Sequence, residues 1–316
     1  MDVLIVGLSS IVLRRVLPAL KSVPQVNRID IATTKSSSTR ESWTDGDVYE
    51  DYADALKRTS AGMVYVSLVN SEHERWARAG VEQGKHVVVD KPAFLGHDAA
   101  RRMVELAAKH DVCLAEATVF GYHPQIEVAR RLFDDGGSTP KRISMVLSFP
   151  PMDPGNFRYQ VALGGGALWD VGPYLAATSR LFFGSDPVTF DCRVLARQDS
   201  SVEIAFSALA TFPGSRSLVG QFGFDTAYLN RLQLLGEACI VEIDRAFTTP
   251  PDHSNSIRVT GPGGLSVVEV APADSFRCFF EQVIARIEAH DWGMLAADLV
   301  ADSRVLESYR SAAGAA

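Results

Sequence analysis

The chain has 316 residues, enough for two globular domains, and its 47% hydrophobic and 22% charged residues are an ordinary balance for a soluble protein. The formal net charge of -7 disfavours a nucleic-acid partner, because neutralising phosphates requires a basic face. No apolar run reaches the roughly 18 residues of a membrane-spanning helix, and no basic leader precedes the first strand pattern, so we expect neither a membrane partner nor secretion.

The first 118 residues alternate short apolar runs with amphipathic stretches. Runs rich in valine, leucine and isoleucine predict strands at residues 3–6, 29–33, 63–68, 86–89 and 112–115. Amphipathic stretches at 72–83 and 98–109 predict helices between them. Because the apolar runs are continuous rather than alternating, they favour a parallel sheet covered by helices on both faces. We therefore predict an α/β, doubly wound Rossmann domain over residues 1–118.

The pattern changes after a helix predicted at 125–133. Every second residue from Val202 to Phe212 is apolar, and Leu218, Phe222 and Phe224 continue the alternation. Such alternation predicts a sheet with one buried face. We therefore predict a second, α+β domain over residues 119–316 with an open, mostly antiparallel sheet.

The buried face of this second sheet needs a cover. The expected cover is the helix after Gly166 together with two closing helical stretches at 275–289 and 295–311. The outer face would then stay uncovered within one chain. We therefore expect a homodimer or homotetramer formed through the outer face of the sheet.

The strand, tight turn and helix at residues 3–20 resemble the place where a dinucleotide pyrophosphate rests on backbone amides. Of the usual G-x-G-x-x-G pattern only Gly7 remains, with Ser9 at the second position and Val12 at the third. A serine hydroxyl can donate to a phosphate, whereas the valine only has to pack. A generic strand-to-helix turn is the alternative if this motif stands alone. The expected cofactor contacts from the turn are Gly7, Ser9, Ser10 and Ile11.

The second predicted strand ends without the acidic residue that would bind the ribose hydroxyls of NAD. It ends instead in Thr33, Thr34 and Lys35, with Arg40 nearby. Hydroxyls and cations suit a 2'-phosphate, so we predict that these four residues bind NADP(H) in preference to NAD(H). A solvated polar loop is the alternative.

Two further segments place polar side chains where a ligand is expected. Lys91 follows the strand predicted at 86–89, and strand ends in doubly wound sheets face the ligand crevice. An exposed lysine at a strand end is the commoner case. Residues 164–174, GGGALWDVGPY, combine three glycines with Asp170 and Tyr174. Consecutive glycines indicate either a close approach by other atoms or an unusual backbone angle.

Three segments, in chain order, resemble the Gfo/Idh/MocA oxidoreductases. Residues 69–87 are similar to the family's T-P-N-x-x-H loop and the helix after it. Asp90-Lys91-Pro92 is similar to its E-K-P motif, with a shorter acidic residue. Residues 164–172 match its G-G-G-x-L-x-D-x-G segment. The resemblance covers essentially the whole chain, and three ordered motifs are far more specific than one.

Tyr174 narrows the resemblance to one part of the family. Many members have histidine four residues after the aspartate, whereas tyrosine resembles the glucose-fructose oxidoreductase branch and, more closely, the NADPH-dependent 3-ketoreductases of nucleotide deoxysugar pathways. Those ketoreductases also lack the full glycine set in the first turn. Further segments that resemble them are 11–20, 116–125, 157–174 and 245–251. The resemblance implies NADPH-dependent reduction of a keto group, at C-3, in a nucleotide-linked deoxysugar.

The resemblance also implies the catalytic roles. Tyr174 would be the general acid, and Lys91 would polarise the carbonyl and hydrogen-bond substrate and ribose. A phenol has an unperturbed pKa of about 10, and a nearby cation brings proton transfer closer to neutral pH. Asp170 would orient the substrate hydroxyl or the lysine, and we expect it to share one helix face with Tyr174. The glycines would let the chain pass close to cofactor and substrate.

The remaining expected contacts follow from the same resemblance. Arg158 is expected to meet the nicotinamide end of the cofactor or a substrate phosphate. Further cofactor contacts are expected from Leu68, Asn70, His73, Asp90, Lys91 and Arg158. Substrate contacts are expected from Glu116, Tyr122, Gly165, Asp170 and Tyr174.

Two other functions stay open at this point: an aldose or dihydrodiol dehydrogenase on the same scaffold, and a non-catalytic nucleotide-binding module. No histidine has metal-ligand spacing with a partner, so we expect no metal. The four cysteines, Cys113, Cys192, Cys239 and Cys278, lie far apart without C-x-x-C spacing. We therefore expect free thiols and a cytoplasmic protein.

Overall fold

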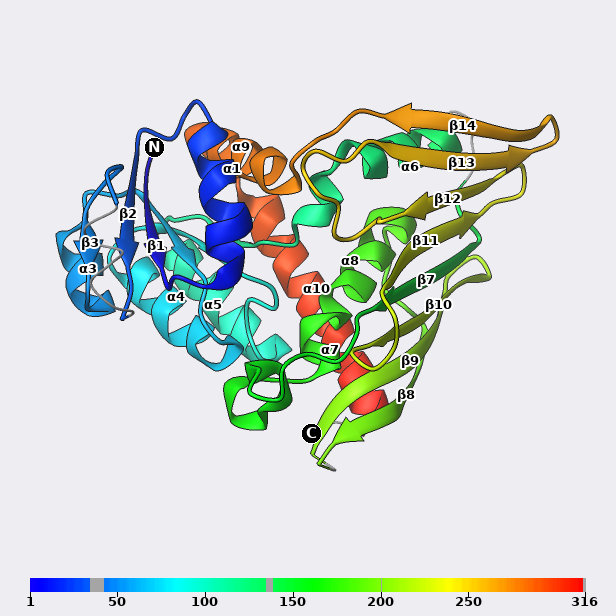
Figure 1. Cartoon of the computed structure of the whole chain (residues 1–316), viewed down its shortest axis with the longest axis horizontal. Coiled ribbons are helices and arrows are strands. Elements are labelled where there is room, and N and C mark those ends of the chain that lie inside the picture. Colours follow the sequence, from blue (N-terminus) through cyan, green and yellow to red (C-terminus); the bar gives the residue numbers. More distant parts are fainter. Residues whose placement is uncertain (35–42, 135–138, 200, 315–316) are drawn as a thin grey trace. The chain divides into compact units, whose positions relative to one another are not determined.

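The computed structural model describes residues 1–34, 43–134, 139–199 and 201–314, and its elements are labelled in Figure 1. The chain divides into two compact units. Unit 1 contains Met1–Ala117 and Phe276–Ala301, and unit 2 contains Thr118–Ser275 and Asp302–Ala316. Lys35 and Arg40, two of the residues expected to bind the 2'-phosphate, lie outside the described residues.

Unit 1 is built on a six-stranded parallel sheet, sheet A, with strand order β3-β2-β1-β4-β5-β6. Its strands are β1 (Asp2–Val6), β2 (Arg28–Ala32), β3 (Val48–Tyr49), β4 (Met63–Val66), β5 (His86–Val89) and β6 (Leu114–Glu116). This is the strand order of a dinucleotide-binding Rossmann fold. The predicted doubly wound domain is confirmed, with β3 as an added two-residue edge strand.

Helices cover both faces of sheet A. They are η1 (Val12–Val16) with α1 (Leu17–Ser22), α3 (Tyr52–Arg58), η2 (Asn70–Glu72) with α4 (His73–Glu82), α5 (His97–Lys109) and α9 (Ser275–Glu288). Alternate strand residues such as Leu4 and Val64 pack in one core with Trp76 of α4 and Met103 of α5. On the other face, where α1 and α9 lie (Figure 1), the ring of Tyr65 packs edge-on against a phenylalanine of α9.

Unit 2 is built on an eight-stranded sheet, sheet B, with strand order β14-β13-β12-β11-β7-β10-β9-β8. Its strands are β7 (Arg142–Ser148), β8 (Thr189–Gln198), β9 (Val202–Phe212), β10 (Arg216–Gly223), β11 (Leu229–Leu235), β12 (Ile240–Asp244), β13 (Asn255–Gly261) and β14 (Gly264–Val270). All neighbouring pairs are antiparallel except β7 and β10, which are parallel. The predicted open, mostly antiparallel sheet is confirmed.

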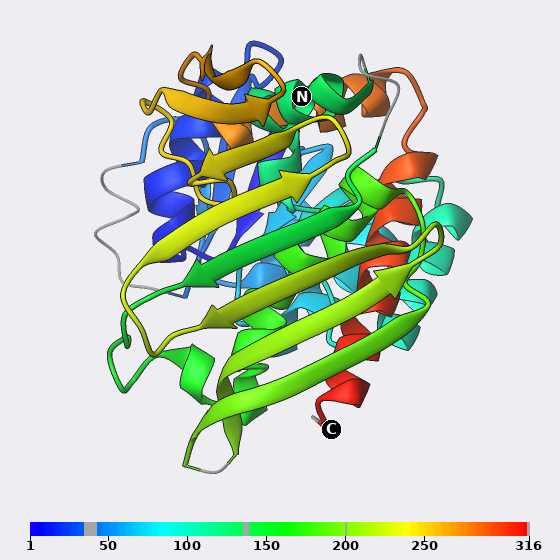
Figure 2. The ribbon, with the colours of Figure 1, turned by 90° about the vertical axis from the view of Figure 1, so that its right-hand side faces the viewer.

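One face of sheet B carries the core of unit 2. The predicted alternation holds over the second half of β9, where Phe206, Ala208, Ala210 and Phe212 are buried and Leu209 is 43% exposed, but in the first half Glu203 and Ala205 are buried and Ile204 is only half-buried. The helices of this unit are η3 (Val119–Tyr122), α6 (Pro124–Asp134), η4 (Phe157–Tyr159), η5 (Val161–Leu163), α7 (Ala167–Asp170), α8 (Gly172–Phe183) and the second half of α10 (Gly293–Ala312). Figure 2 shows the other face of the sheet, across which no described helix runs.

The two closing helices do not both belong to the second unit, as the expected 119–316 domain requires. Phe279, Phe280, Val283 and Ile284 of α9 are fully buried, and α9 belongs to unit 1. Helix α10 contributes Leu299 to the core of unit 1, whereas its later residues belong to unit 2. The reason is that an amphipathic pattern shows which face of a helix is buried but does not show against which sheet.

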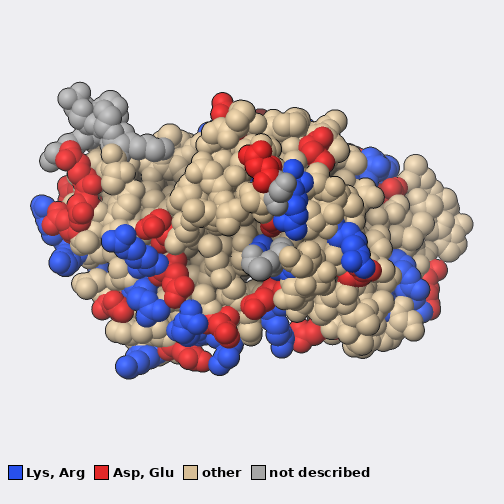
Figure 3. All heavy atoms as spheres, turned by 90° about the horizontal axis from the view of Figure 1, so that it is seen from below, with Lys and Arg blue, Asp and Glu red and all other residues tan. Residues whose placement is uncertain are grey.

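The charged side chains do not gather by sign on the face drawn in Figure 3. There, lysine and arginine alternate with aspartate and glutamate among the described residues. Within the described part of the chain, no helix is long and apolar enough to cross a membrane. Among the same residues, no group of three histidine, cysteine or acidic side chains is placed to hold a metal ion.

Candidate active site

The first turn of unit 1 needs glycine at Gly7 and uses the hydroxyl of Ser9. Gly7 has φ +96°, and a Cβ there would lie 2.2 Å from the carbonyl oxygen of Ser67. The Oγ of Ser9 lies 2.9 Å from the Oγ of Ser67 and accepts a hydrogen bond from the amide of Val12 at 3.2 Å. The turn therefore packs directly on the end of β4, while Ser10 is exposed and Ile11 half-buried.

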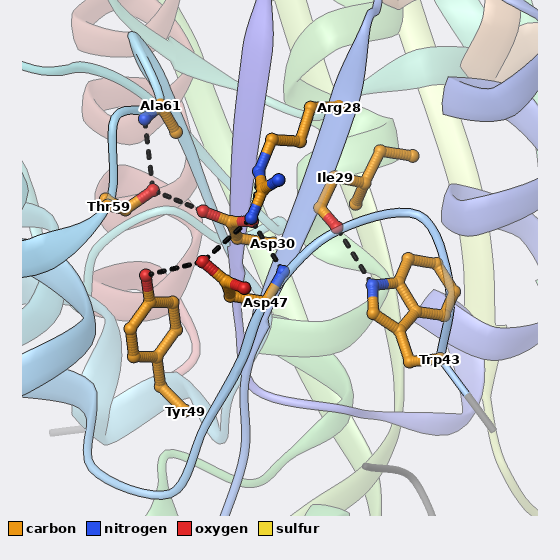
Figure 4. Close-up of polar contacts among 8 residues, drawn as sticks. All are labelled: Arg28, Ile29, Asp30, Trp43, Asp47, Tyr49, Thr59 and Ala61. Atoms are coloured by element: carbon orange, nitrogen blue, oxygen red, sulfur yellow. Dashed lines mark hydrogen bonds and ion pairs between the residues drawn. The ribbon is translucent and has the colours of Figure 1, made fainter. Parts of the chain in front are cut away.

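The acidic residue of β2 lies within the strand and is bound by the chain itself. Asp30 is buried, and its carboxylate accepts from the Thr59 hydroxyl at 2.7 Å and the Asp47 amide at 2.8 Å (Figure 4). The indole of Trp43 donates to the carbonyl oxygen of Ile29 at 2.9 Å. These bonds hold the segment that enters β3 against the edge of β2.

Two of the residues expected to bind the 2'-phosphate, Thr33 and Thr34, are described and lie directly after β2. Thr33 is buried, and its amide donates to the carbonyl oxygen of Tyr49 at 2.9 Å. Thr34 is exposed.

The segment 90–93 after β5, which we call the Lys91 turn, is held at both ends by hydrogen bonds to side chains of unit 1. The carboxylate of Asp90 accepts hydrogen bonds from the hydroxyls of Tyr65 and Ser67. On the other side, the amide of Ala93 donates to Oε2 of Glu116 at 2.8 Å. The backbone that carries Lys91 is therefore anchored to β4 and β6, next to its own strand β5.

His73 joins two loops at this end of sheet A. It is fully buried, with Nδ1 2.9 Å from the carbonyl oxygen of Pro92 and Nε2 3.1 Å from that of Leu68. Leu68 is half-buried, and Asn70, which begins η2, is buried. The structure thus gives His73, Asp90 and Glu116, which were expected to contact ligands, polar partners that fix the loop geometry.

The glycine run of unit 2 is explained by close approach of the chain to itself. Gly164 is left-handed with φ +74° and ends η5. A Cβ on Gly165 would lie 2.6 Å from the carbonyl oxygen of Arg158, and one on Gly166, at φ +116°, would lie 2.5 Å from Oε1 of Glu203. The atoms that would collide with a side chain at Gly165 and Gly166 belong to unit 2 itself.

Asp170 and Tyr174 do not share one helix, and the prediction that they do was wrong. Helix α7 ends at Asp170, Val171 departs from helical geometry at φ -113° and ψ -13°, and α8 begins at Gly172. The glycine-proline pair after Val171 starts a new helix, because proline fixes a first-turn conformation.

The two side chains have different surroundings. Asp170 is 9% exposed, and its Oδ2 lies 2.9 Å from Nε of Arg158, which also lies over the ring of Phe157. Tyr174 is half-buried, and its ring packs against Phe120 and Phe247 at centroid distances of 5.5 and 5.6 Å. Tyr122, in η3 beside Phe120, is also half-buried.

A buried ion pair behind the glycine run was missed by sequence reasoning. Nη1 of Arg310 lies 3.3 Å from Oε1 of Glu203, and the guanidinium lies 3.9 Å from the ring centroid of Trp169. Burial lowers the pKa of Arg310, while the charge of Glu203 opposes this. Glu203 has the outward parity of β9, but the register of β8 and β9 shifts between Ala196 and Arg197, and such a bulge re-aims side chains.

Comparison with known proteins identifies the family. The oxidoreductase family Gfo/Idh/MocA with an NAD-binding Rossmann fold matches residues 1–118, and the Gfo/Idh/MocA C-terminal domain matches residues 129–264. The chain belongs to the Gfo/Idh/MocA oxidoreductases.

Several members of this family are similar over most of their length. The chain is 32% identical over 272 residues to the dTDP-3,4-didehydro-2,6-dideoxy-alpha-D-glucose 3-reductase of Streptomyces violaceoruber, covering 82% of this chain and 77% of the relative. A 3-ketoreductase from Actinomadura kijaniata, solved with NADP and TDP-benzene, superposes with a TM-score of 0.93 at 25% identity, covering 99% of this chain and 98% of that one. The D-xylose 1-dehydrogenase (NADP(+)) 2 of Haloferax volcanii is 25% identical over 241 residues, covering 76% and 74%.

Proposed function

We propose that this Gfo/Idh/MocA oxidoreductase reduces a keto group, at C-3, of a nucleotide-linked deoxysugar with NADPH as the reductant. The observation that carries the proposal is the similarity, over most of both chains, to 3-ketoreductases that act on dTDP-linked sugars or are solved with NADP. The motif residues that accompany this activity, Lys91 and Tyr174, are both present.

The residues of unit 1 fit a dinucleotide. Gly7 opens a turn at the carboxyl end of β1 in which a Cβ would collide with backbone, and a helix begins directly after it. Backbone amides at such a helix start bind pyrophosphate. The turn from Gly7 to Ile11 would hold the pyrophosphate, and Thr33 and Thr34 would begin the 2'-phosphate contacts. When bound, NADPH supplies the hydride that reduces the carbonyl carbon.

The chain's own side chains supply and guide the proton. We assign the general acid to the Tyr174 phenol, which protonates the developing alkoxide oxygen. The Lys91 ammonium polarises the same carbonyl and stabilises the phenolate that the proton transfer leaves. Asp170 orients the substrate hydroxyl or the lysine, and its bond to Arg158 fixes the carboxylate for that task.

The remaining assignments follow the same scheme. Leu68, Asn70 and His73 shape the cofactor pocket from the loop after β4. Glu116, Tyr122 and Gly165 contact the sugar or its nucleotide. Arg158 acts on the ligands through Asp170, its partner in the structure.

A dehydrogenase acting on an aldose is the second candidate, because the D-xylose 1-dehydrogenase relative aligns with 76% of this chain at 25% identity. The two candidates differ in substrate and direction. A ketoreductase consumes NADPH with a nucleotide-linked ketosugar, whereas an aldose dehydrogenase forms NADPH from NADP⁺ with a free sugar.

The experiment that tests the proposal is a panel of dTDP-linked ketosugars and free aldoses, assayed by NADPH absorbance and by product analysis. Turnover of a 3-ketosugar with NADPH supports the proposal. Turnover of aldoses alone would replace it with the second candidate. Cofactor binding without turnover of either class would favour a nucleotide-binding module. Tryptophan-fluorescence titration with NADPH and NADH tests the cofactor preference, and equal affinities would contradict it.

We also propose how the protein assembles and where it works. The uncovered face of sheet B (Figure 2) carries Leu209 and Val219, which face each other across β9 and β10 and are 43% and 44% exposed. This apolar pair supports a homodimer or homotetramer formed through that face. The four cysteines are free thiols, as expected in the reducing cytoplasm. Burial raises the pKa of the Cys113 and Cys192 thiols to about 12, so both are protonated at neutral pH and poorly reactive.

A further inference from the structure

Four side chains of unit 1 form a continuous row of hydrogen bonds across three neighbouring strands. Ser9 in the turn after β1 contacts Ser67 after β4, and Ser67 contacts Asp90 after β5. Tyr65, inside β4, contacts the other oxygen of the same carboxylate. The row therefore connects the turn expected to hold the cofactor with the residue directly before Lys91.

The chemistry of the groups fixes the direction of this row. An ionised carboxylate only accepts hydrogen bonds, so Ser67 donates its single hydroxyl proton to Asp90. Ser67 can then only accept from Ser9, which must donate its own proton to Ser67. The remaining capacity of Ser9 is as an acceptor, and the amide of Val12 fills part of it. The Ser9 hydroxyl is thus not available as a donor to a phosphate.

Tyr65 is suited to be a permanent donor at the other end. Its side chain is fully buried and packs edge-on against Phe280. Burial, then the charge of Asp90 and the hydrogen bond to it, raise the pKa of Tyr65 well above its ordinary value. The hydroxyl therefore keeps its proton for Asp90 throughout the physiological range.

We propose that Tyr65 and Ser67 are positioning residues that act through Asp90 to set the Lys91 backbone, and that Ser67 also ties this setting to the cofactor turn through Ser9. The inference rests on the proposed function for the role of Lys91. It assigns a task to the aspartate that replaces the longer family glutamate: with both oxygens engaged by Tyr65 and Ser67, Asp90 serves as an anchor.

The three hydroxyls predict three different kinetic patterns. Ser9→Ala removes the two contacts at the turn, with the Ser67 hydroxyl and with the Val12 amide, so it raises the Kd of NADPH and leaves kcat nearly unchanged. Tyr65→Phe keeps the ring and removes only one anchor of Asp90, so it lowers kcat about tenfold, as expected for a small displacement of a catalytic group. It changes the Kd of NADPH less than Ser9→Ala does, because the turn expected to hold the pyrophosphate keeps its bonds. Ser67→Ala removes both bonds and changes both quantities.

Matched controls remove hydroxyls of unit 1 that do not belong to the row. Ser22→Ala removes a hydroxyl that donates to the carbonyl oxygen of Ala19 in α1. Tyr52→Phe keeps a ring that packs against Trp76. Both controls are expected to keep the wild-type kcat and Kd. A merely structural role of the row would lower the melting temperature without producing the split between kcat and Kd.

A double-mutant cycle tests whether Tyr65 acts through Asp90. In an Asp90→Ala background, Tyr65→Phe is expected to cause no further loss of kcat, because the group it positions is gone. A full additive loss would overturn the assignment, as would a Tyr65→Phe or Ser67→Ala variant whose kcat stays within twofold of the controls. If Ser67→Ala does not fold, the Ser9 and Tyr65 variants still decide the question.

Failure of the positioning role and failure of the proposed function give different results in these experiments. If the wild-type protein reduces no ketosugar, the proposed function fails, while the expected rise in the Kd of NADPH for Ser9→Ala and Ser67→Ala is still measured by fluorescence. If the wild-type protein is active and Lys91→Ala abolishes turnover but neither Tyr65→Phe nor Ser67→Ala alters it, the positioning role fails and the proposed function stands.

Discussion

Nε of Arg158 lies 2.9 Å from Oδ2 of Asp170, so the arginine before the glycine run and the aspartate after it form an ion pair within unit 2. The side chain of Asp170 is 13% exposed and that of Arg158 is 30% exposed. A pair of this kind orients the carboxylate and offsets the cost of burying it.

The pair predicts the phenotype of Arg158→Ala. We expect a loss of about 1–3 kcal/mol in the free energy of unfolding, because a buried acceptor loses a charged partner. We also expect kcat to fall roughly tenfold from misplacement of Asp170, with the Kd of NADPH unchanged. Urea denaturation and fluorescence titration measure these quantities. Arg193→Ala, which removes an exposed pair with Asp191, is the control and should cost about 0–1 kcal/mol. A large rise in the Kd of NADPH for Arg158→Ala would instead mean that the guanidinium contacts the cofactor.

Gly166 gives a second prediction, because both its backbone and its surroundings exclude a side chain. Its φ is +116°, a conformation that costs an alanine about 1–3 kcal/mol. The new Cβ would also displace the Glu203 carboxylate from its contact with Arg310. We therefore expect Gly166→Ala to lower the free energy of unfolding by about 3 kcal/mol or more, adding the loss of a buried charged hydrogen bond.

Gly184 is the matched control for that substitution. It is also left-handed, with φ +58°, but nothing lies within 4 Å of its missing Cβ. Gly184→Ala should therefore cost only the left-handed backbone, about 1–2 kcal/mol. Equal losses for the two alanine variants would show that contact with Glu203 contributes nothing to the requirement for glycine at Gly166.

The same region shows what sequence can and cannot predict. The glycine run was correctly interpreted as a sign of close approach or an unusual backbone angle, since both causes are local. The approaching atoms, the carbonyl oxygen of Arg158 and the carboxylate of Glu203, were not predictable, because one depends on the turn before the run and the other on a register shift in β9.

The two sheets were predictable for a related reason. A continuous apolar run indicates a strand that is buried on both faces, and strict alternation indicates a strand that is buried on one face. Both patterns can be read from the residues of the strand itself. The two-residue strand β3 has too few residues to show a pattern. The sharing of α9 and α10 between the units depends on which sheet offers a complementary surface, and no pattern within a helix contains that information.

The side chains of the Lys91 turn were identified by motif, but their partners were not. Asp90 and Glu116 were expected to meet ligands because they lie in segments that resemble those of the family. Their hydrogen bonds to Tyr65 and to the amide of Ala93 join neighbouring strands that are adjacent only in the folded sheet. Tyr65 itself lies in the apolar run 63–68, which the sequence predicts only as a strand.

His86 predicts a pH dependence of the stability of unit 1. Burial, and then the charge of His290, lower the pKa of His86, while Asp111 opposes this. The unfolded state therefore takes up a proton near pH 6.5, while the folded state takes it up only at lower pH. Stability contributed by neutral His86 is present above about pH 6.5 and is lost as the pH falls through that value.

We expect His86→Gln to lose less melting temperature than the wild-type protein between about pH 7.5 and about pH 5. Glutamine can still accept the bond that the Cys113 amide donates to Nδ1 of His86. His253→Gln, at an exposed position of unit 2, serves as the control and should follow the wild-type profile. An unchanged profile for His86→Gln would assign the acid sensitivity to other groups.

The open face of sheet B predicts the effect of charge on assembly. We expect light scattering to give a dimer or tetramer for the wild-type protein at micromolar concentration and a smaller species for Leu209→Lys with Val219→Lys, because two buried ammonium groups oppose association. Met294→Lys, at a residue of unit 1 that is 54% exposed, is the control. A wild-type monomer, or an unchanged assembly of the double variant, would contradict the assigned interface.

Tyr174 and Lys91 carry the central prediction for catalysis. Tyr174→Phe keeps a ring that packs against Phe120 and Phe247 and deletes only the hydroxyl. We therefore expect the Kd of NADPH to stay within about twofold and turnover to fall by roughly 10²- to 10⁴-fold, as for loss of a general acid. Tyr228→Phe, at an exposed tyrosine of the same unit, is the control and should be active.

Lys91→Ala should be at least as damaging as Tyr174→Phe, because it removes the cation that assists both the phenol and the carbonyl. The double variant should be little worse than the poorer single variant, since residues that act as a unit are not additive. Single-turnover oxidation of bound NADPH by a ketosugar separates the chemical step from binding. If the phenylalanine variant reduces substrate within a few-fold of the wild-type rate, the proton comes from another group and Tyr174 only packs. If the two single losses instead multiply in the double variant, Lys91 and Tyr174 act independently, and the lysine does not tune the phenol.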